Sequence, residues 1–189
     1  MYPDLRERLL AALDPSPAPV PASGDRLAAV LAPLVMAPEP ALVFTQRSDE
    51  LPRHAGEISF PGGMTEPGDV GLEATALREA HEEIGLDPSL PEVLGALPPV
   101  HTFVSAILVV PFVGMLTEPP ALTIDEGEIT RVLTVSLRDL QAAEREVEWE
   151  RPGGGTWKGW VYEVDGATIW GATGKMLHDL LEIIHGENR

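Results

Sequence analysis

Three glutamates crowd into one short helical segment, "LREAHEEIGL" at residues 77–86. An α-helix turns by about 100° per residue, so Glu79, Glu82 and Glu83 fall within an arc of about 100°. No lysine or arginine follows any of them at i+4, and like charges at such spacing destabilise a helix. Most charge runs of this kind are solvated faces. Here the spacing favours a site for a hard divalent cation, which binds carboxylate oxygens.

A glycine-containing loop, "SFPGGMTEPGD" at residues 59–69, comes directly before this helix. Glycine lets backbone groups approach a ligand closely, and a helix N-terminus favours phosphate. A glycine pair alone is more often an ordinary turn. Together with the acidic helix, Gly62 and Gly63 become candidates for phosphate binding.

The elements that must position these residues follow from the hydrophobic pattern. The acidic helix is expected over residues 72–84, with Asp69 as its N-cap and Gly85 as its C′ glycine. Its apolar face is expected to contain Leu77, Ala80 and Ile84. This face predicts packing on a sheet.

The rest of the chain predicts a mixed α/β order. A helix is expected over residues 4–13, then a Pro/Ala-rich connector and a second short helix over 25–31. Strands are expected at 41–47, 92–100, 103–116, 129–137, 146–150, 156–164 and 167–170, and a closing helix at 171–186. We therefore expect one α/β sandwich, with residues 1–33 as a helical extension of the main domain at 34–189.

Composition excludes several classes of protein. The chain has 13 basic and 30 acidic residues and a net charge of −17, which disfavours contact with nucleic acid or anionic membrane. Cysteine is absent, so neither a disulfide nor a thiolate nucleophile is available. No segment approaches the roughly 18 apolar residues of a membrane span. A cytoplasmic protein with a small-molecule substrate is expected.

The segment "REAHEEIGL" resembles the second half of the Nudix box, which runs Gly, five residues, Glu, seven residues, then Arg-Glu-apolar-x-Glu-Glu-x-Gly-apolar. The first half departs from it. The span from Gly63 to Arg78 is one residue longer, and Asp69 stands near the position of the first glutamate. The resemblance implies a Nudix-type α/β/α sandwich with a mixed central sheet, and metal-dependent hydrolysis of a pyrophosphate linkage.

The segment "VFTQRSDELPRHAGEISFPGG" at residues 43–63 is similar to the upstream signature of the coenzyme A pyrophosphatase branch, and "IWGATGKML" to its C-terminal segment. Two residues differ: Pro52 stands where the branch usually has arginine, and Met64 replaces a basic residue. The resemblance implies hydrolysis of coenzyme A or its derivatives to 3′,5′-ADP and 4′-phosphopantetheine. A Nudix enzyme for ADP-ribose or NADH, and a non-catalytic nucleotide-binding Nudix module, stay open.

By the same resemblance, Mg²⁺ or Mn²⁺ would be held by Glu79, Glu82 and Glu83, with the Gly63 carbonyl as a further ligand. Arg78 would orient this group. The general base is open between Glu79 and a loop glutamate, for which Glu128 is the candidate.

Positive groups upstream of the glycine loop are the candidates for substrate binding. Arginine suits planar, bidentate recognition of phosphate, so Arg47 and Arg53 are expected to contact it, together with His54. The four tryptophans are expected in the core or at an interface rather than stacked on adenine. Whether the chain forms a homodimer stays open.

Overall fold

The computed structural model describes residues 4–48, 55–102, 106–150 and 155–186. Helices span α1 (Leu5–Ala12), α2 (Leu72–Ile84), α3 (Leu137–Ala143) and α4 (Gly171–His185). The first strands along the chain are β1 (Arg26–Val35), β2 (Ala41–Arg47), β3 (Ile58–Ser59), β4 (Gly62–Met64), β5 (Glu92–Ala96) and β6 (Val100–Thr102). The later strands are β7 (Ile107–Leu116), β8 (Ile129–Ser136), β9 (Glu144–Glu150), β10 (Thr156–Val164) and β11 (Ala167–Ile169).

The central sheet is mixed because one long parallel pair is flanked by antiparallel strands. Its main path runs β3-β2-β1-β7-β5, and β1 pairs with β7 in parallel along ten residues, from Arg26↔Ile107 to Val35↔Leu116. Three further strands pair off this path: β4 with β1, β6 with β7 and β8 with β2. Gly62 and Gly63, which the sequence places in a loop, lie in strand β4 and are therefore anchored directly to a central strand.

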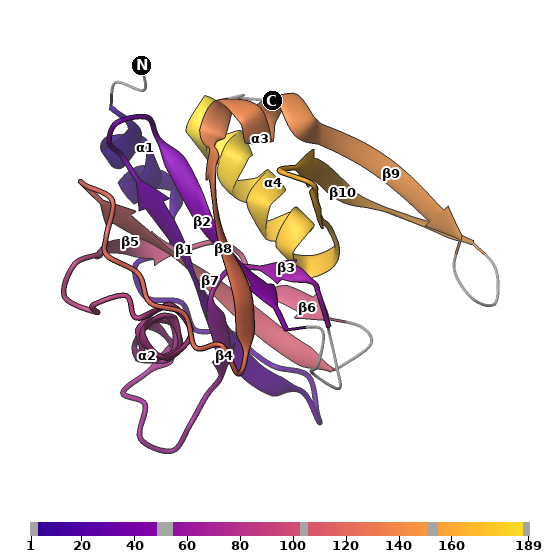
Figure 1. Cartoon of the computed structure of the whole chain (residues 1–189). Helices are drawn as coiled ribbons and strands as arrows, with labels where there is room; N and C mark the ends of the chain where they lie inside the picture. Colours follow the sequence, from indigo (N-terminus) through magenta and orange to yellow (C-terminus); the bar gives the residue numbers. More distant parts are fainter. Residues whose placement is uncertain (1–3, 49–54, 103–105, 151–154, 187–189) are drawn as a thin grey trace.

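Helices cover the sheet on both faces (Figure 1). Helix α2 packs on one face, where its apolar side meets the central strands. Buried members of this layer are Ala29, Leu31, Ala76, Ala80, Ile84, Val110 and Phe112. Helices α1 and α4 belong to the larger core on the other face. The expected α/β/α sandwich with a mixed central sheet is confirmed.

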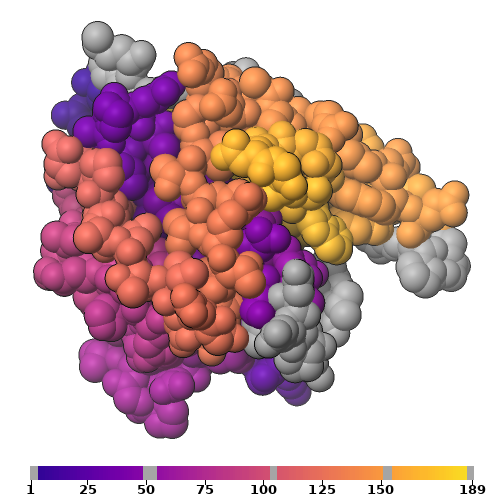
Figure 2. Space-filling model, viewed as in Figure 1, coloured from indigo at the N-terminus to yellow at the C-terminus, as the bar shows by residue number. Residues whose placement is uncertain are grey.

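A second, three-stranded sheet of order β11-β10-β9 precedes α4. The β9–β10 hairpin extends beyond the rest of the molecule (Figure 2). It is tied to α4 at its base, where His178 Nδ1 lies 2.9 Å from Glu144 Oε1 and the Tyr162 hydroxyl donates to the same oxygen at 2.6 Å.

The short helix expected at residues 25–31 is wrong, because this segment is the first part of β1. Its Ala/Leu-rich sequence has the composition of a helix. However, β1 is buried from Ala28 to Val35 and lies at the centre of the sheet, where both faces are covered. Strands in such positions have continuous apolar sequences, and tertiary pairing overrides the local preference.

Most of the other expected elements are confirmed within a few residues. These include the strand at 41–47, the strand beginning at Ile129, the acidic helix and the closing helix. The strand expected over residues 129–137 ends at Ser136, and the chain continues from there as helix α3, which the sequence pattern does not predict. Within the described residues no helix has the length and apolar character to cross a bilayer. The division of the chain at residue 33 stays a prediction.

Candidate active site

Strand β4, which contains Gly62 and Gly63, lies in direct contact with the acidic helix α2. The Gly62 N–H donates to Glu83 Oε2 at 3.2 Å, and a Cβ placed on Gly63 would lie 2.5 Å from the Glu79 carboxyl carbon. Gly62 has a φ of +157° and no room for a side chain, because an added Cβ would lie 2.5 Å from the Ala29 carbonyl oxygen. Gly63 is therefore needed for Glu79 to approach β4, and Gly62 is needed for β4 to lie against β1.

Glu83 is the most buried acidic side chain of the site, with 4% of its surface exposed. Burial raises its pKa to about 8, and the nearby carboxylates of Glu79 and Glu128 add to this rise. The Gly62 N–H and the guanidinium of Arg47 act in the opposite direction. A carboxylate so poorly compensated has a strong tendency to bind a proton or another cation.

Glu79 lies beside it with 16% of its side chain exposed. Burial raises its pKa, and Glu82 and Glu128 raise it further, whereas its hydrogen bond from Arg78 acts against the rise. Three carboxylates, those of Glu79, Glu83 and Glu128, thus lie close enough to influence one another.

Arg78 is fully occupied by partners within the protein. Its Nε donates to Asp69 Oδ1 at 2.9 Å, and its Nη2 donates to Asp69 Oδ2 at 3.1 Å and to the Met64 carbonyl at 3.0 Å. Its Nη1 donates to Glu79 at 2.8 Å and to Glu82 at 3.0 Å. All its N–H directions are used, so Arg78 holds the loop and the helix together and has no donor left for a substrate.

The expected role of Asp69 as a helix N-cap is wrong, since Gly71 occupies that position and makes no side-chain cap. The Asp69 carboxylate instead accepts hydrogen bonds from Arg78, from the Glu66 N–H at 2.8 Å and from Thr75 Oγ1 at 2.7 Å. These bonds, the one from Arg78 foremost, hold its pKa well below the ordinary value. The position of Asp69 near the first glutamate of the Nudix box is the sequence feature that pointed to its contact with Arg78. The expected C′ residue, Gly85, is confirmed by its left-handed conformation.

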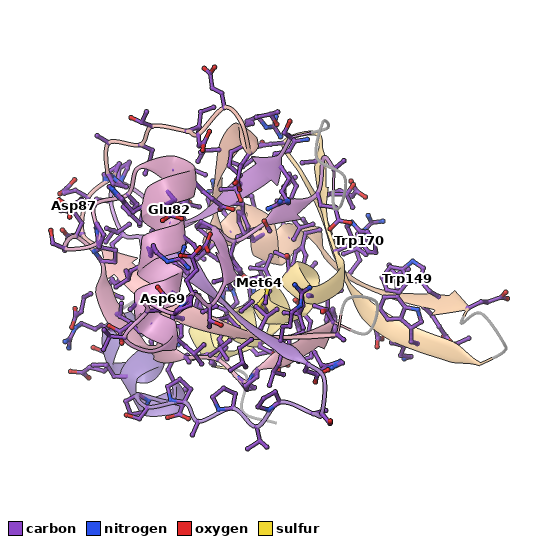
Figure 3. The ribbon with its side chains drawn as sticks, turned by 90° about the horizontal axis from the view of Figure 1, so that it is seen from below. Met64, Asp69, Glu82, Asp87, Trp149 and Trp170 are labelled. Atoms are coloured by element: carbon purple, nitrogen blue, oxygen red, sulfur yellow. The ribbon has the colours of Figure 1, made fainter. Side chains whose placement is uncertain are left out.

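Glu82 differs from the other two glutamates because 56% of its side chain is exposed. It lies on α2 and accepts from Arg78, and Figure 3 labels it together with Asp69, which belongs to the loop before the helix. Its role as a metal ligand stays a prediction. His81 is also exposed, and its Nδ1 lies 3.2 Å from the Leu86 carbonyl oxygen at the end of the helix.

The loop that carries Glu128 is fixed between α2 and β2. The Asp125 N–H donates to the Glu83 carbonyl at 2.9 Å, and the Ser48 N–H donates to the Glu128 carbonyl at 2.8 Å. The Glu128 side chain itself is exposed. Neither backbone contact could be inferred from the sequence, because Asp125 is 42 residues away from Glu83 and Glu128 is 80 residues away from Ser48.

Among the candidates for substrate binding, Arg47 is described and lies next to the acidic group. Its Nη1 is 3.8 Å from Glu83 Oε1, and 27% of its side chain is exposed. Arg53 and His54 lie outside the described residues.

The tryptophans lie away from the glutamates. Trp149 and Trp157 stack on each other across the β9–β10 hairpin with ring centroids 4.3 Å apart, and Trp160 stacks on His178. Figure 3 shows Trp149 and Trp170 at the opposite end of the molecule from Glu82. They are therefore no adenine platform over the acidic group.

The donor set suits a hard divalent cation in its chemistry. Mg²⁺ and Mn²⁺ prefer oxygen ligands, such as carboxylate oxygens and backbone carbonyl oxygens. The buried glutamates also repel one another and have few counter-charges within the described residues. Within the part of the chain that the structure describes, no three Asp, Glu or His side chains are arranged as a ready-made metal cluster. The metal ligands therefore stay a prediction that requires rearrangement of side chains.

Comparison with known families defines the class to which this fold and site belong. The NUDIX domain family matches residues 25–153, which include strand β4, the acidic helix α2 and the loop that carries Glu128. The chain belongs to the Nudix family, whose hydrolases generally use divalent metal ions.

The relatives are similar over most of their length. A protein of Pectobacterium atrosepticum named "Uncharacterized Nudix hydrolase NudL" is 34% identical over 181 residues, covering 94% of this chain and 91% of the relative. The protein of the same name from Salmonella paratyphi B is 38% identical over 159 residues, with 82% and 81% covered.

Solved structures agree on the fold. The NUDIX domain of Shewanella oneidensis NrtR, crystallised with ADP ribose, has a TM-score of 0.51 at 20% identity and covers 72% of this chain and 86% of its own. A MutT/nudix family protein of Enterococcus faecalis has a TM-score of 0.51 at 17% identity, covering 89% and 63%.

Proposed function

We propose that this chain is a Mg²⁺- or Mn²⁺-dependent pyrophosphohydrolase that cleaves coenzyme A or its derivatives to 3′,5′-ADP and 4′-phosphopantetheine. The observation that supports it most is the contact of Glu83 and Glu79 with Gly62 and Gly63 of β4, with the carboxylate of Glu128 near both glutamates. An acidic protein needs a cation at this place before an anionic diphosphate can approach. A bound divalent ion supplies phosphate neutralisation and lowers the pKa of a water.

The residues of this chain have separable roles in the proposed reaction. Glu79 and Glu83 hold the cation next to the Gly62–Gly63 backbone, and Arg78 fixes the rotamer of Glu79 by its 2.8 Å hydrogen bond. Glu128 is the candidate base, because its exposed carboxylate is near the other two and its backbone is anchored by Ser48.

Coenzyme A specificity rests on the upstream segment at residues 43–63. This segment has Arg47 at the end of β2, where its guanidinium faces the acidic group. Arginine in this position suits a substrate with several phosphates. The Shewanella neighbour was crystallised with ADP ribose, which makes ADP-ribose the main competing substrate to test.

The test is a substrate panel with Mg²⁺ and with Mn²⁺, its products resolved by anion-exchange chromatography. Coenzyme A, dephospho-coenzyme A, ADP-ribose and NADH are compared by kcat/KM, with folded Glu83→Gln as the inactive control. Formation of 3′,5′-ADP with the highest kcat/KM for coenzyme A would support the proposal. Faster turnover of ADP-ribose would replace the substrate, and nucleotide binding without turnover of any compound would indicate a non-catalytic module.

A further inference from the structure

Arg47 differs from Arg78 in how its guanidinium is used. The five N–H donors of Arg78 face hydrogen-bond acceptors, whereas the Nε of Arg47 is buried and has no hydrogen-bond partner within the described residues. Its Nη1 lies 3.8 Å from Glu83 Oε1, which is an ion-pair distance and too long for a hydrogen bond. Arg47 therefore compensates the charge of Glu83 without a tight contact.

The backbone of Arg47 is fixed, so this proximity is built into the sheet. Its N–H donates to the Glu57 carbonyl at 3.0 Å, and its carbonyl accepts from the Gly56 N–H at 3.2 Å. The pairing of β2 with β8 is irregular between Gln46 and Arg47, which is how a β-bulge redirects a side chain.

Glu83, in turn, has few other positive contacts. Its side chain is 4% exposed, and within the described residues its carboxylate has the Gly62 N–H and the Arg47 guanidinium as partners. Nearby Glu79 and Glu128 repel it. A buried carboxylate is unstable without a counter-charge. The Glu83 carboxylate therefore attracts either the Arg47 guanidinium or a divalent cation.

We infer that Arg47 is an internal counter-ion of Glu83 that a divalent cation must displace, and that this displacement frees the guanidinium for a substrate phosphate. The inference rests on the proposed metal site and extends it, because it makes metal binding and phosphate binding mutually favourable. Such coupling is reciprocal, and its usual size is on the order of 5- to 150-fold. Arg47 would thus pair with Glu83 when no metal is bound, and with a substrate phosphate when the metal is bound.

The first test measures metal affinity of the full chain without substrate, by electron paramagnetic resonance of free Mn²⁺ at fixed ionic strength and at one pH above 8, where the Glu83 carboxylate is ionised. Arg47→Met should bind Mn²⁺ about tenfold more tightly than the wild type, because the competitor is gone. Arg131→Met is the matched control, since Arg131 lies opposite Gln46 in β8 and contacts the Asp165 carbonyl instead. It loses the same charge and should change the affinity by less than about twofold.

Arg47→Gln is a second neutral variant, which retains a polar side chain and should show the same gain if Arg47→Met fails to fold. In the Glu83→Gln background, removal of Arg47 should have no effect on Mn²⁺ affinity. An unchanged or weaker Mn²⁺ affinity of the Arg47 variants, or an equal gain in Arg131→Met, would overturn this inference. Neither outcome would contradict the proposed metal site. Absence of Mn²⁺ binding to the wild type would overturn the inference together with the metal site.

The second test measures binding of 3′,5′-ADP by titration calorimetry in the presence of chelator, at the same pH above 8. Glu83→Gln releases Arg47, so it should bind the nucleotide at least fivefold more tightly than Glu73→Gln, an exposed change of equal charge on the same helix. The gain should vanish when Arg47→Met is added. Equal affinities for the two single variants would contradict the alternating role.

Discussion

Replacement of Glu83 by glutamine should remove a pH dependence of stability that the metal-free protein has. Its pKa is about 8 in the folded chain, against 4.5 for an ordinary glutamate. Between these values the folded state holds a proton that the unfolded state has lost, so the free energy of unfolding falls as the pH rises. Below 4.5 and above about 8 this group contributes no slope.

The size of the effect follows from the two pKa values. Between pH 5.5 and pH 8 the ionisation of Glu83 lowers the free energy of unfolding by about 3 kcal/mol at most. For a chain of this length that corresponds to a fall in Tm of about 6–12 °C. Mg²⁺ favours the ionised carboxylate, so a saturating concentration should flatten the slope and raise Tm most at the higher pH.

The assay is scanning calorimetry in chelator at several pH values, repeated with millimolar Mg²⁺. Glu83→Gln should lose most of the fall in Tm, whereas Glu73→Gln should retain it, since Glu73 is exposed in the first turn of the same helix. A wild-type Tm that stays flat or rises from pH 5.5 to 8 in chelator, or a Glu83→Gln slope equal to that of the wild type, would refute the reasoning.

Two further substitutions test the positioning of the site, and one comparison of substrates tests the recognition of the 3′-phosphate. Asp69→Asn should lower kcat by about 10- to 100-fold with little change in KM, because Arg78 loses its bidentate partner; an unchanged kcat would contradict this. Gly63→Ala should lower kcat/KM by about 100-fold through its contact with Glu79, while Gly68→Ala, with open space around its Cβ, should not; equal effects of the two changes would exclude the steric explanation. Dephospho-coenzyme A should be hydrolysed with a kcat/KM about tenfold below that of coenzyme A, since it lacks the 3′-phosphate and one charge-assisted contact; equal values would reject a role for that phosphate.

The sequence by itself determined the parts of this protein that depend on local pattern. The 3.6-residue period and the glycine after Ile84 defined helix α2, and Ala80 and Ile84 are buried as their spacing required. The resemblance of residues 78–86 to the second half of the Nudix box was sufficient to indicate the family, because this motif is one continuous segment of the chain.

Tertiary structure decided the features that depend on contacts between distant segments. The segment at residues 25–31 is a strand because β7 pairs with it, although its composition favours a helix. Glu82 and Glu83 are adjacent in sequence, but one faces water and the other is buried beside Arg47. Burial and the approach of distant charges set the pKa of Glu83, and neither quantity is encoded in the spacing of residues along one helix.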